Sequence, residues 1–341
     1  MPETINREKG DGQSLVIDMH CHFMSRRADD IAIPLRKAEN EPTLAAIGTD
    51  STKKWAGHID SIDARIRGRT LRLEEMDAMG VDIQIVSPGP MQYCYYLEPE
   101  IGRQVSSIVN DDLVEMVSGQ PDRLKAMGTV PLQQTEFAIA ELNRCVGELG
   151  MRAIEISTHV NGEELSIARL RPFFARAEEL GVVLFIHPLG FTDGRRLAKH
   201  YFINSIGNPL ESTIAVAHLI YDGVLDQFPG LKFVVAHGGG YIAHCVGRLD
   251  HTATPEYSDH EFPQLPSDYL KRFYFDTVLH DPIEIENLVR RWGAERVLLG
   301  SDWPYRMGET DPVGLLDRCA LNKFDRDAIA GRNAAQLFGL E

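Results

Sequence analysis

Short apolar runs alternate along the chain with longer stretches of helical periodicity. Residues 98–118, for example, place apolar side chains at three- and four-residue spacing, which predicts one buried helical face. Several helical stretches end at a glycine just before the next apolar run, and such a glycine is typical of a helix C-terminus. These glycines are Gly80, Gly150, Gly181 and Gly293.

The apolar runs are predicted to be strands. Most of them lack strict alternation of polar and apolar residues, which is typical of parallel strands buried on both faces. Eight such runs begin near Leu15, Val81, Leu124, Arg152, Val182, Leu231, Phe273 and Arg296. Eight strands with mostly helical segments between them predict an α/β fold, the (β/α)8 TIM-type barrel.

The barrel is expected to form one domain over residues 15–341, preceded by a polar N-terminal extension over residues 1–14. Residues 24–63, after the first strand, show no sustained period. An insertion of this length is expected to cover the mouth of an active site. Residues 325–340 are predicted to form a closing helix.

Composition limits the partners. The chain has 50 acidic and 35 basic residues, and its formal net charge of −15 disfavours binding to nucleic acid or to an anionic membrane surface. No apolar run approaches the roughly 18 residues that a membrane helix needs. An anionic substrate would therefore need locally placed arginines.

The cysteines argue against a disulfide framework. They are odd in number, widely spaced and contain no Cys-x-x-Cys pair, so a reducing cytoplasm is the expected location. They are Cys21, Cys94, Cys145, Cys245 and Cys319.

Side chains with metal-binding chemistry follow several of the predicted strands. His20 and His22 end LVIDMHCHF, His187 ends LFIHP, His237 ends VVAHGGG, and Asp302 ends LLGSDWP. Residues i and i+2 of a strand share a face, so the first two imidazoles are expected to project together. Because the C-terminal ends of barrel strands meet at one rim, all five side chains are expected to lie there.

Each residue also has an ordinary structural explanation. His187 before Pro188 resembles a core or loop histidine, His237 could open a tight glycine turn, and Asp302 could cap a helix. These explanations are independent of one another, and none of them predicts a shared rim position.

Histidines and a carboxylate at one rim predict a catalytic metal site with an open position. The mixed nitrogen and oxygen donors suit Zn²⁺ and do not exclude Mn²⁺, Fe²⁺ or Co²⁺. A metal of this kind lowers the pKa of bound water from about 15.7 toward about 7. His237 is the candidate to hold or accept the proton.

The motifs DMHCHF, FIHP, AHGGG and GSDWP, in that order and on those strands, resemble the amidohydrolase superfamily. Within it they resemble the branch of metal-dependent decarboxylases related to aminocarboxymuconate-semialdehyde decarboxylase. RLEEMDAMGVDIQIVSPGP, NPLESTIAV and FYFDTVLHDP extend the likeness over nearly the whole chain after Leu15.

The resemblance implies roles for individual residues. His20, His22, His187 and Asp302 are expected to bind Zn²⁺, and His237 to activate the metal-bound water. The resemblance also implies that Arg248 reaches into the neighbouring subunit's site and holds a substrate carboxylate there. A functional homodimer follows. From the sequence alone, an ordinary surface charge on a helix is the favoured interpretation of Arg248.

Two departures from the family pattern point to a changed substrate. The second substrate-binding arginine of the family is not identifiable among Arg65, Arg67 and Arg69, and Leu189 stands where the similar enzyme has an aromatic residue. Many superfamily hydrolases bridge two metals with a modified lysine at the end of strand four. MRAIEISTH carries no lysine there, so a mononuclear site is expected.

The predicted function is metal-dependent nonoxidative decarboxylation of an unsaturated or aromatic carboxylic acid, a carbon-carbon lyase reaction on a small anionic substrate. A hydrolase or hydratase that acts on a related aromatic-degradation intermediate is the alternative, because fold does not decide the reaction. A catalytically silent binding protein on the same barrel is a third possibility, and the complete set of ligands argues against it.

Overall fold

The computed structural model describes residues 15–37 and 56–340. All eight predicted apolar runs contain strands, and the prediction of a (β/α)8 TIM-type fold is confirmed. The strands are β1 (Ile17–Phe23), β2 (Ile83–Pro88), β3 (Leu124–Ala126) with β4 (Gly128–Thr129), β5 (Ala153–Ile156), β8 (Val183–Ile186), β9 (Lys232–Val235), β10 (Tyr274–Asp276) and β11 (Val297–Leu298).

The strands pair in parallel in two arcs, β1-β2-β3 and β11-β10-β9-β8-β5-β4. The arcs meet at Met127, whose N–H donates to β2 at 2.8 Å. On the other side, the Met19 N–H donates to Leu299 O at 2.9 Å and the His22 N–H to Trp303 O at 2.8 Å. The ladder of strand pairs is therefore not continuous around the ring, and a few separate backbone hydrogen bonds bring the arcs together.

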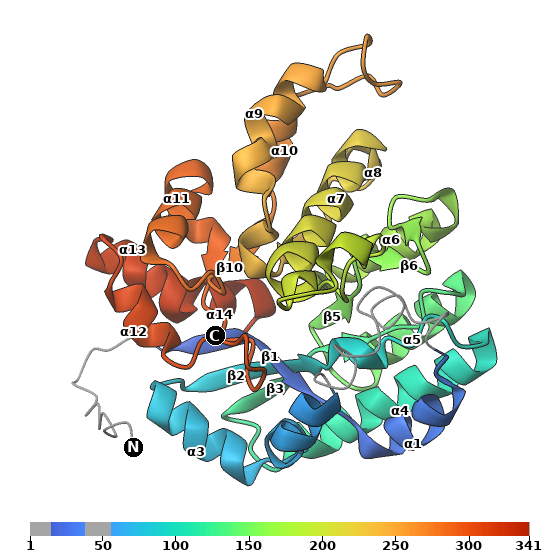
Figure 1. The fold of residues 1–341 in the computed structure, drawn as a ribbon, viewed down its shortest axis with the longest axis vertical. Helices are drawn as coiled ribbons and strands as arrows, with labels where there is room; N and C mark the ends of the chain where they lie inside the picture. Colours follow the sequence, from blue (N-terminus) through green and yellow to red (C-terminus); the bar gives the residue numbers. More distant parts are fainter. Residues whose placement is uncertain (1–14, 38–55, 341) are drawn as a thin grey trace.

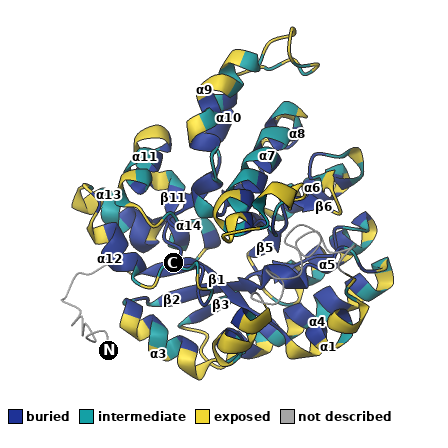
Figure 2. Ribbon diagram, viewed as in Figure 1, coloured by how far each residue is buried: buried dark blue, intermediate teal, exposed yellow. Residues whose placement is uncertain are grey.

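Helices surround the strands, with their buried faces turned inward and their exposed faces outward (Figures 1 and 2). This arrangement follows from the apolar faces predicted for these stretches. The surrounding helices are α3 (Thr70–Met79), α4 (Pro99–Ser118), α5 (Thr135–Gly147), α6 (Arg171–Leu180), α7 (Asn208–Tyr221), α8 (Val224–Gln227), α11 (Pro282–Trp292) and α12 (Pro312–Asp317).

Two elements stand apart from the ring of helices. The helices α9 (Ile242–Thr252) and α10 (Pro266–Leu270) form an arm that projects from the barrel (Figure 1). A short antiparallel hairpin, β6 (His159–Val160) and β7 (Glu163–Glu164), follows β5. Among the described residues, no helix is both long and apolar enough to cross a membrane.

The section after the first strand is more regular than predicted. Helix α1 (Arg26–Leu35) and the helical residues 56–67 lie within it, so the expectation of an irregular stretch is wrong there. The Ser25 Oγ caps α1 by accepting a hydrogen bond from the Ala28 N–H at 3.0 Å. Pro34 lies in the last turn of α1, and a proline there made the stretch look irregular in the sequence. Residues 38–55, the rest of the expected insertion, lie outside the described residues, as does the extension 1–14.

The closing segment is helical, as predicted. It runs without a break through α13 (Lys323–Asp327), a π-helical turn (Ala328–Arg332) and α14 (Asn333–Phe338). In α14, Ala334 and Phe338 pack with apolar side chains from several strands. This cluster closes the interior of the barrel, including Ile17, Met19, Phe185, Val234 and Leu298.

Candidate active site

The five side chains predicted to share one rim converge in the structure. His20, His187, His237 and Asp302 each offer a ligand atom, and these atoms lie within 4.8 Å of one another. His22 joins them, with its Nε2 3.1 Å from Nε2 of His20. The residues come from β1 and from the segments that follow β8, β9 and β11.

Asp302 lies at the centre of this cluster. Its Oδ1 is 3.1 Å from His22 Nε2 and 3.3 Å from His20 Nε2, and its Oδ2 is 3.9 Å from His237 Nε2. The ring centroid of His187 lies 4.9 Å from those of His20 and His22 and 5.0 Å from that of His237. His237 is the most open member, with 14% of its side chain exposed.

The backbone at two of these residues is in the left-handed region. His237 has φ 55° and Asp302 has φ 58°, an uncommon conformation for residues with a Cβ. Three glycines with positive φ follow His237, and they allow the chain to turn sharply after β9. Such local strain is held by the surrounding fold and is concentrated at functional positions.

Gly300 allows β1 to approach the segment that carries Asp302. A Cβ at Gly300 would lie 2.9 Å from the Cβ of His20, closer than side chains tolerate. The close approach brings His20 and Asp302 into contact.

Two hydrogen bonds fix the orientation of the β1 histidines. The Nδ1 of His20 lies 2.6 Å from Oδ2 of Asp276, and the Nδ1 of His22 lies 2.9 Å from the carbonyl oxygen of Pro88. Because both partners are acceptors, each Nδ1 carries the proton and donates it. Each Nε2 is then the atom that carries a lone pair in the neutral ring, as metal-binding histidines require.

The charges of the cluster are strongly coupled. Burial lowers the pKa of His20, but the Asp276 and Asp302 carboxylates outweigh burial and raise it to about 10. Burial raises the pKa of Asp302, but His20 and His22 outweigh burial and hold it well below its usual value. Burial and the surrounding imidazoles lower the pKa of His187 well below its usual value, so this ring is neutral and can act as a ligand.

These donors fit a divalent cation. The Nε2 atoms of His20 and His22 lie 3.1 Å apart. Two neutral rings would point lone pairs at each other there and repel, so this spacing requires a proton or a cation between them. Both ring nitrogens of His187 and Oδ1 of Asp302 are buried without a hydrogen-bond partner among the described residues. Buried polar atoms without partners are costly, and a metal ion would satisfy several of them together.

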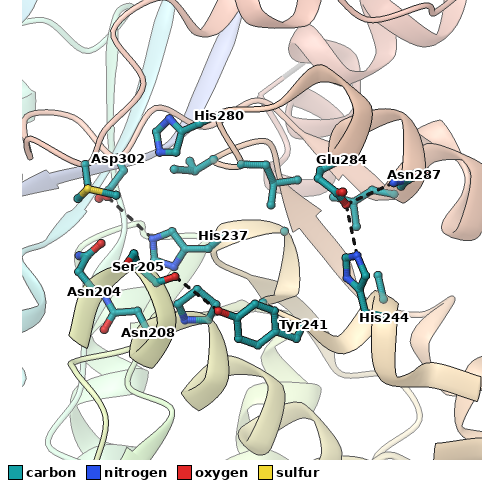
Figure 3. Close-up of a pocket in the computed structure, with 18 residues that line it drawn as sticks. Asn204, Ser205, Asn208, His237, Tyr241, His244, His280, Glu284, Asn287 and Asp302 are labelled. Atoms are coloured by element: carbon teal, nitrogen blue, oxygen red, sulfur yellow. Dashed lines mark hydrogen bonds and ion pairs between the residues drawn. The ribbon is translucent and has the colours of Figure 1, made fainter. Parts of the chain in front are cut away.

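Two cavities meet at the cluster. The larger has a volume of about 410 Å³, and its wall includes His244, His280, Glu284 and Asn287 (Figure 3). The Glu309 carboxylate raises the pKa of His280. Several polar side chains thus lie in the wall of this cavity among apolar ones.

The smaller cavity has a volume of about 80 Å³ and is mostly apolar. Met91, Leu189 and Ile203 line it together with Tyr305, whose buried hydroxyl has no hydrogen-bond partner among the described residues. The two cavities share a wall formed by Asn204, Asn208, His237, Asp302 and Met307. His237 thus faces both spaces.

The structure does not bring the candidate arginines to this cluster. Arg65 pairs with Glu75 at 2.8 Å, and Arg67 is held by Asp29 and Asp63. Arg69 donates to the Met116 carbonyl at 3.0 Å.

Arg248 is exposed on α9 in the projecting arm. Among the described residues that line the two cavities there is no arginine and no lysine.

Asp276 and Glu155 are site residues that the sequence reasoning did not assign. Asp276 ends β10 and, besides His20, accepts from the Gly238 N–H at 3.0 Å and the Val278 N–H at 3.1 Å. The sequence contained a signal for Asp276, because the seventh apolar run, FYFD, ends in this aspartate at the same rim as the other site residues. Glu155 is fully buried in β5, and burial raises the pKa of its carboxyl group.

Comparison with known proteins places the chain among enzymes. A 2-amino-3-carboxymuconate-6-semialdehyde decarboxylase of Dictyostelium discoideum is 30% identical over 337 residues, covering 96% of this chain and 93% of the relative. A gamma-resorcylate decarboxylase of Rhodococcus jostii is 28% identical over 300 residues, covering 83% and 91%. A more distant relative, a 2-keto-4-carboxy-3-hexenedioate hydratase of Sphingobium, is 25% identical over 303 residues, covering 82% and 84%.

Solved structures with a similar fold also match nearly the whole chain. The crystal structure of 5-carboxyvanillate decarboxylase from Novosphingobium aromaticivorans, complexed with manganese and 4-hydroxy-3-methoxy-5-nitrobenzoic acid, superposes with a TM-score of 0.87 at 22% identity and covers 98% of each chain. A sequence profile described as amidohydrolase matches residues 17–340. The resemblance seen in the sequence is confirmed, and the chain belongs to the amidohydrolase family.

Proposed function

We propose that this protein is a metal-dependent nonoxidative decarboxylase of an unsaturated or aromatic carboxylic acid. The observation that carries the proposal is the convergence of four imidazoles and a carboxylate at the meeting point of two cavities. The named decarboxylases among the relatives agree with this class of reaction.

His20, His22, His187 and Asp302 would hold one divalent cation per chain. Zn²⁺ suits these donors, and Mn²⁺, which a decarboxylase of the same fold contains, suits them as well. When bound, such a cation acts as a Lewis acid that stabilises negative charge on substrate oxygens as CO₂ departs.

His237 would manage the proton. Loss of CO₂ breaks a carbon-carbon bond and leaves its electron pair on the substrate carbon, which must then take up one proton. His237 faces both cavities and is more exposed than the other cluster residues, so it can exchange protons with solvent and deliver one to that carbon.

The shapes of the two cavities support this class of substrate. The small apolar cavity beside Leu189 and Met91 suits a flat unsaturated group, and the unpartnered Tyr305 hydroxyl offers a hydrogen bond to a substrate oxygen. The larger cavity leaves room for a polar substituent next to His280. A changed substrate relative to the named relatives is consistent with Leu189 at this wall.

We also propose that the enzyme works as a homodimer in which Arg248 serves the partner's site. Arg248 lies exposed on the projecting arm, and the described walls of both cavities lack a cationic side chain of their own apart from histidines. An arginine from a second copy would supply the bidentate donor that a substrate carboxylate prefers.

Product analysis tests the reaction. The protein, loaded with Mn²⁺ or with Zn²⁺, is incubated in D₂O with a carboxylated muconate semialdehyde and with hydroxybenzoates. We expect CO₂ release and one deuterium on the carbon that lost the carboxylate. The hydratase relative makes hydration the second candidate, and a product that gains water without releasing CO₂ would replace decarboxylation with that function.

A further inference from the structure

Glu155 is a buried carboxylate that the proposed mechanism does not use. It lies in β5 (Ala153–Ile156) with no exposed surface. The Tyr93 hydroxyl donates to its Oε1 at 2.5 Å, whereas its Oε2 has no hydrogen-bond partner among the described residues. Burying an incompletely paired carboxylate is costly, so a compensating role is expected.

Both oxygens of Glu155 face ring nitrogens of the proposed metal ligands. Oε2 lies 3.9 Å from Nδ1 of His22, and Oε1 lies 3.9 Å from Nδ1 of His187. In His22 this nitrogen already donates to Pro88, while in His187 it has no hydrogen-bond partner among the described residues. Among the described residues, no other carboxylate lies within 4 Å of a His187 ring nitrogen.

The three histidines are therefore unequally supported. His20 donates its Nδ1 proton to Asp276 and His22 donates its own to Pro88, but His187 lacks such an acceptor at hydrogen-bonding distance. A metal-binding histidine usually donates its second ring N–H to a carboxylate or a carbonyl, which fixes its tautomer and orientation.

We propose that Glu155 is the positioning residue of His187. It accepts the Nδ1 proton of that ring, directly after a small movement or through one water, and so presents the Nε2 lone pair to the cation. This inference rests on the proposed metal site, and it assigns a role to the acidic residue that ends the fourth strand of the barrel.

Glu155 supports the ligands from behind and is not a further ligand. It lies on the Nδ1 side of His22, whereas the Nε2 of that ring faces His20 and Asp302. A carboxylate in this position adds negative charge near the cation without occupying a coordination position. One metal per chain is the expected stoichiometry.

Metal affinity tests this role without relying on activity. The metal-free protein is titrated with Mn²⁺ in competition with a chelating dye, and metal content is measured in parallel. We expect Glu155→Gln, which keeps the shape of the side chain but removes its charge, to weaken Mn²⁺ binding by about 10- to 100-fold. The unchanged protein should bind one metal per chain.

Glu141→Gln is the matched control. Glu141 is also buried, but it lies on α5 and pairs with Arg144 and Asn110 away from the cluster. This variant should lose thermal stability and keep its Mn²⁺ affinity. If Glu155→Gln folds and binds Mn²⁺ as the unchanged protein does, or if the unchanged protein binds two metals, the inference is wrong.

A second variant covers the case in which Glu155→Gln does not fold. Tyr93→Phe removes the donor to Glu155 Oε1 but leaves the carboxylate in place, and it should weaken Mn²⁺ binding by several fold. Unchanged affinity in this variant would also contradict the inference. If the unchanged protein binds no metal at all, the proposed metal site itself fails, which is a separate outcome.

Discussion

At the scale of single residues, the site depends on acceptors that hold imidazoles in one orientation. Asp276 binds His20 and also accepts from two backbone N–H groups, so its own position is fixed by the turns after β9 and β10. A fixed acceptor determines which ring nitrogen of His20 carries the lone pair. His20, a proposed metal ligand, and its acceptor Asp276 are therefore expected to act together.

Asp276→Asn tests this unit. The amide keeps the size of the side chain but can turn its NH₂ group toward His20, which would place the lone pair on the wrong nitrogen. We expect metal affinity to fall by about 10- to 100-fold, as measured by chelator competition. Asp268→Asn, on the arm, should leave metal affinity unchanged, and an unaltered affinity in Asp276→Asn would contradict the assigned role.

His237→Asn separates a proton donor from a metal ligand. As a general acid, His237 contributes about 10²- to 10⁴-fold to kcat, so the variant should lose activity by that factor and retain one metal per chain. Metal content by atomic emission and steady-state kinetics provide the two readouts. His218→Asn, on α7 and outside the walls of both cavities, is the control for a lost imidazole and should keep its activity. A metal content well below one per chain would show that His237 is a ligand instead.

The sequence predicted which residues converge but not how they are held. His20, His187 and Asp302 were predictable because each ends an apolar run, and strand ends meet at one rim in a parallel barrel. The contact of Asp276 with His20 depends on three-dimensional spacing between β10 and β1, which periodicity does not contain. For the same reason, the sequence indicates that the end of the fourth strand lacks a lysine but gives Glu155 no role.

At the scale of elements, strands were more predictable than the helices near the mouth. Buried parallel strands are continuously apolar, so their positions are visible in the sequence. Helix α1 is short and is fixed by contacts from distant residues, including the ion pair of Arg67 with Asp29 and the bond from the Ser25 hydroxyl to Asp112 at 2.5 Å. Contacts between residues so far apart in sequence leave no periodic signal.

The glycine turn after β9 is an element whose geometry the site requires. Gly240 has φ 66° and ψ −127°, and a Cβ there would lie 1.9 Å from the carbonyl oxygen of Pro209 on α7. Gly240→Ala should therefore destabilise the fold by at least about 3 kcal/mol and displace His237. Denaturant unfolding measures the change in stability.

Gly147→Ala provides the comparison. Gly147 lies at the end of α5, and a Cβ there meets nothing within 4 Å. This substitution should be neutral or stabilising by up to about 1 kcal/mol. Equal unfolding midpoints for the two variants would show that the turn tolerates a side chain.

At the scale of the whole molecule, the negative net charge of the chain does not favour binding of an anionic substrate. The chain carries a net charge of −15, yet the proposed substrate is an anion. The described cavity walls contain imidazoles but no arginine or lysine, and the candidate Arg248 is on the arm that projects from the barrel (Figure 1). A second copy of the chain would supply the missing positive charge, because its Arg248 guanidinium could reach the site of its partner.

Mixing two inactive variants tests whether Arg248 acts across subunits. The His237→Asn and Arg248→Ala proteins should each have low activity. In a mixed dimer, the chain that keeps His237 receives Arg248 from its partner, so one of the two sites is intact. After subunit exchange in an equal mixture, activity should recover to about one quarter of that of the unchanged enzyme.

The control mixture combines His237→Asn with Asp302→Asn. Both residues belong to the cluster within a single chain, so no mixed dimer has an intact site and activity should stay low. If the first mixture also fails to recover although exchange is complete, Arg248 does not act in the partner's site. If activity recovers only in the mixture with Arg248→Ala, the arm of one chain completes the active site of the other. Only an Arg248 that is donated between subunits can restore activity to a chain that carries Arg248→Ala.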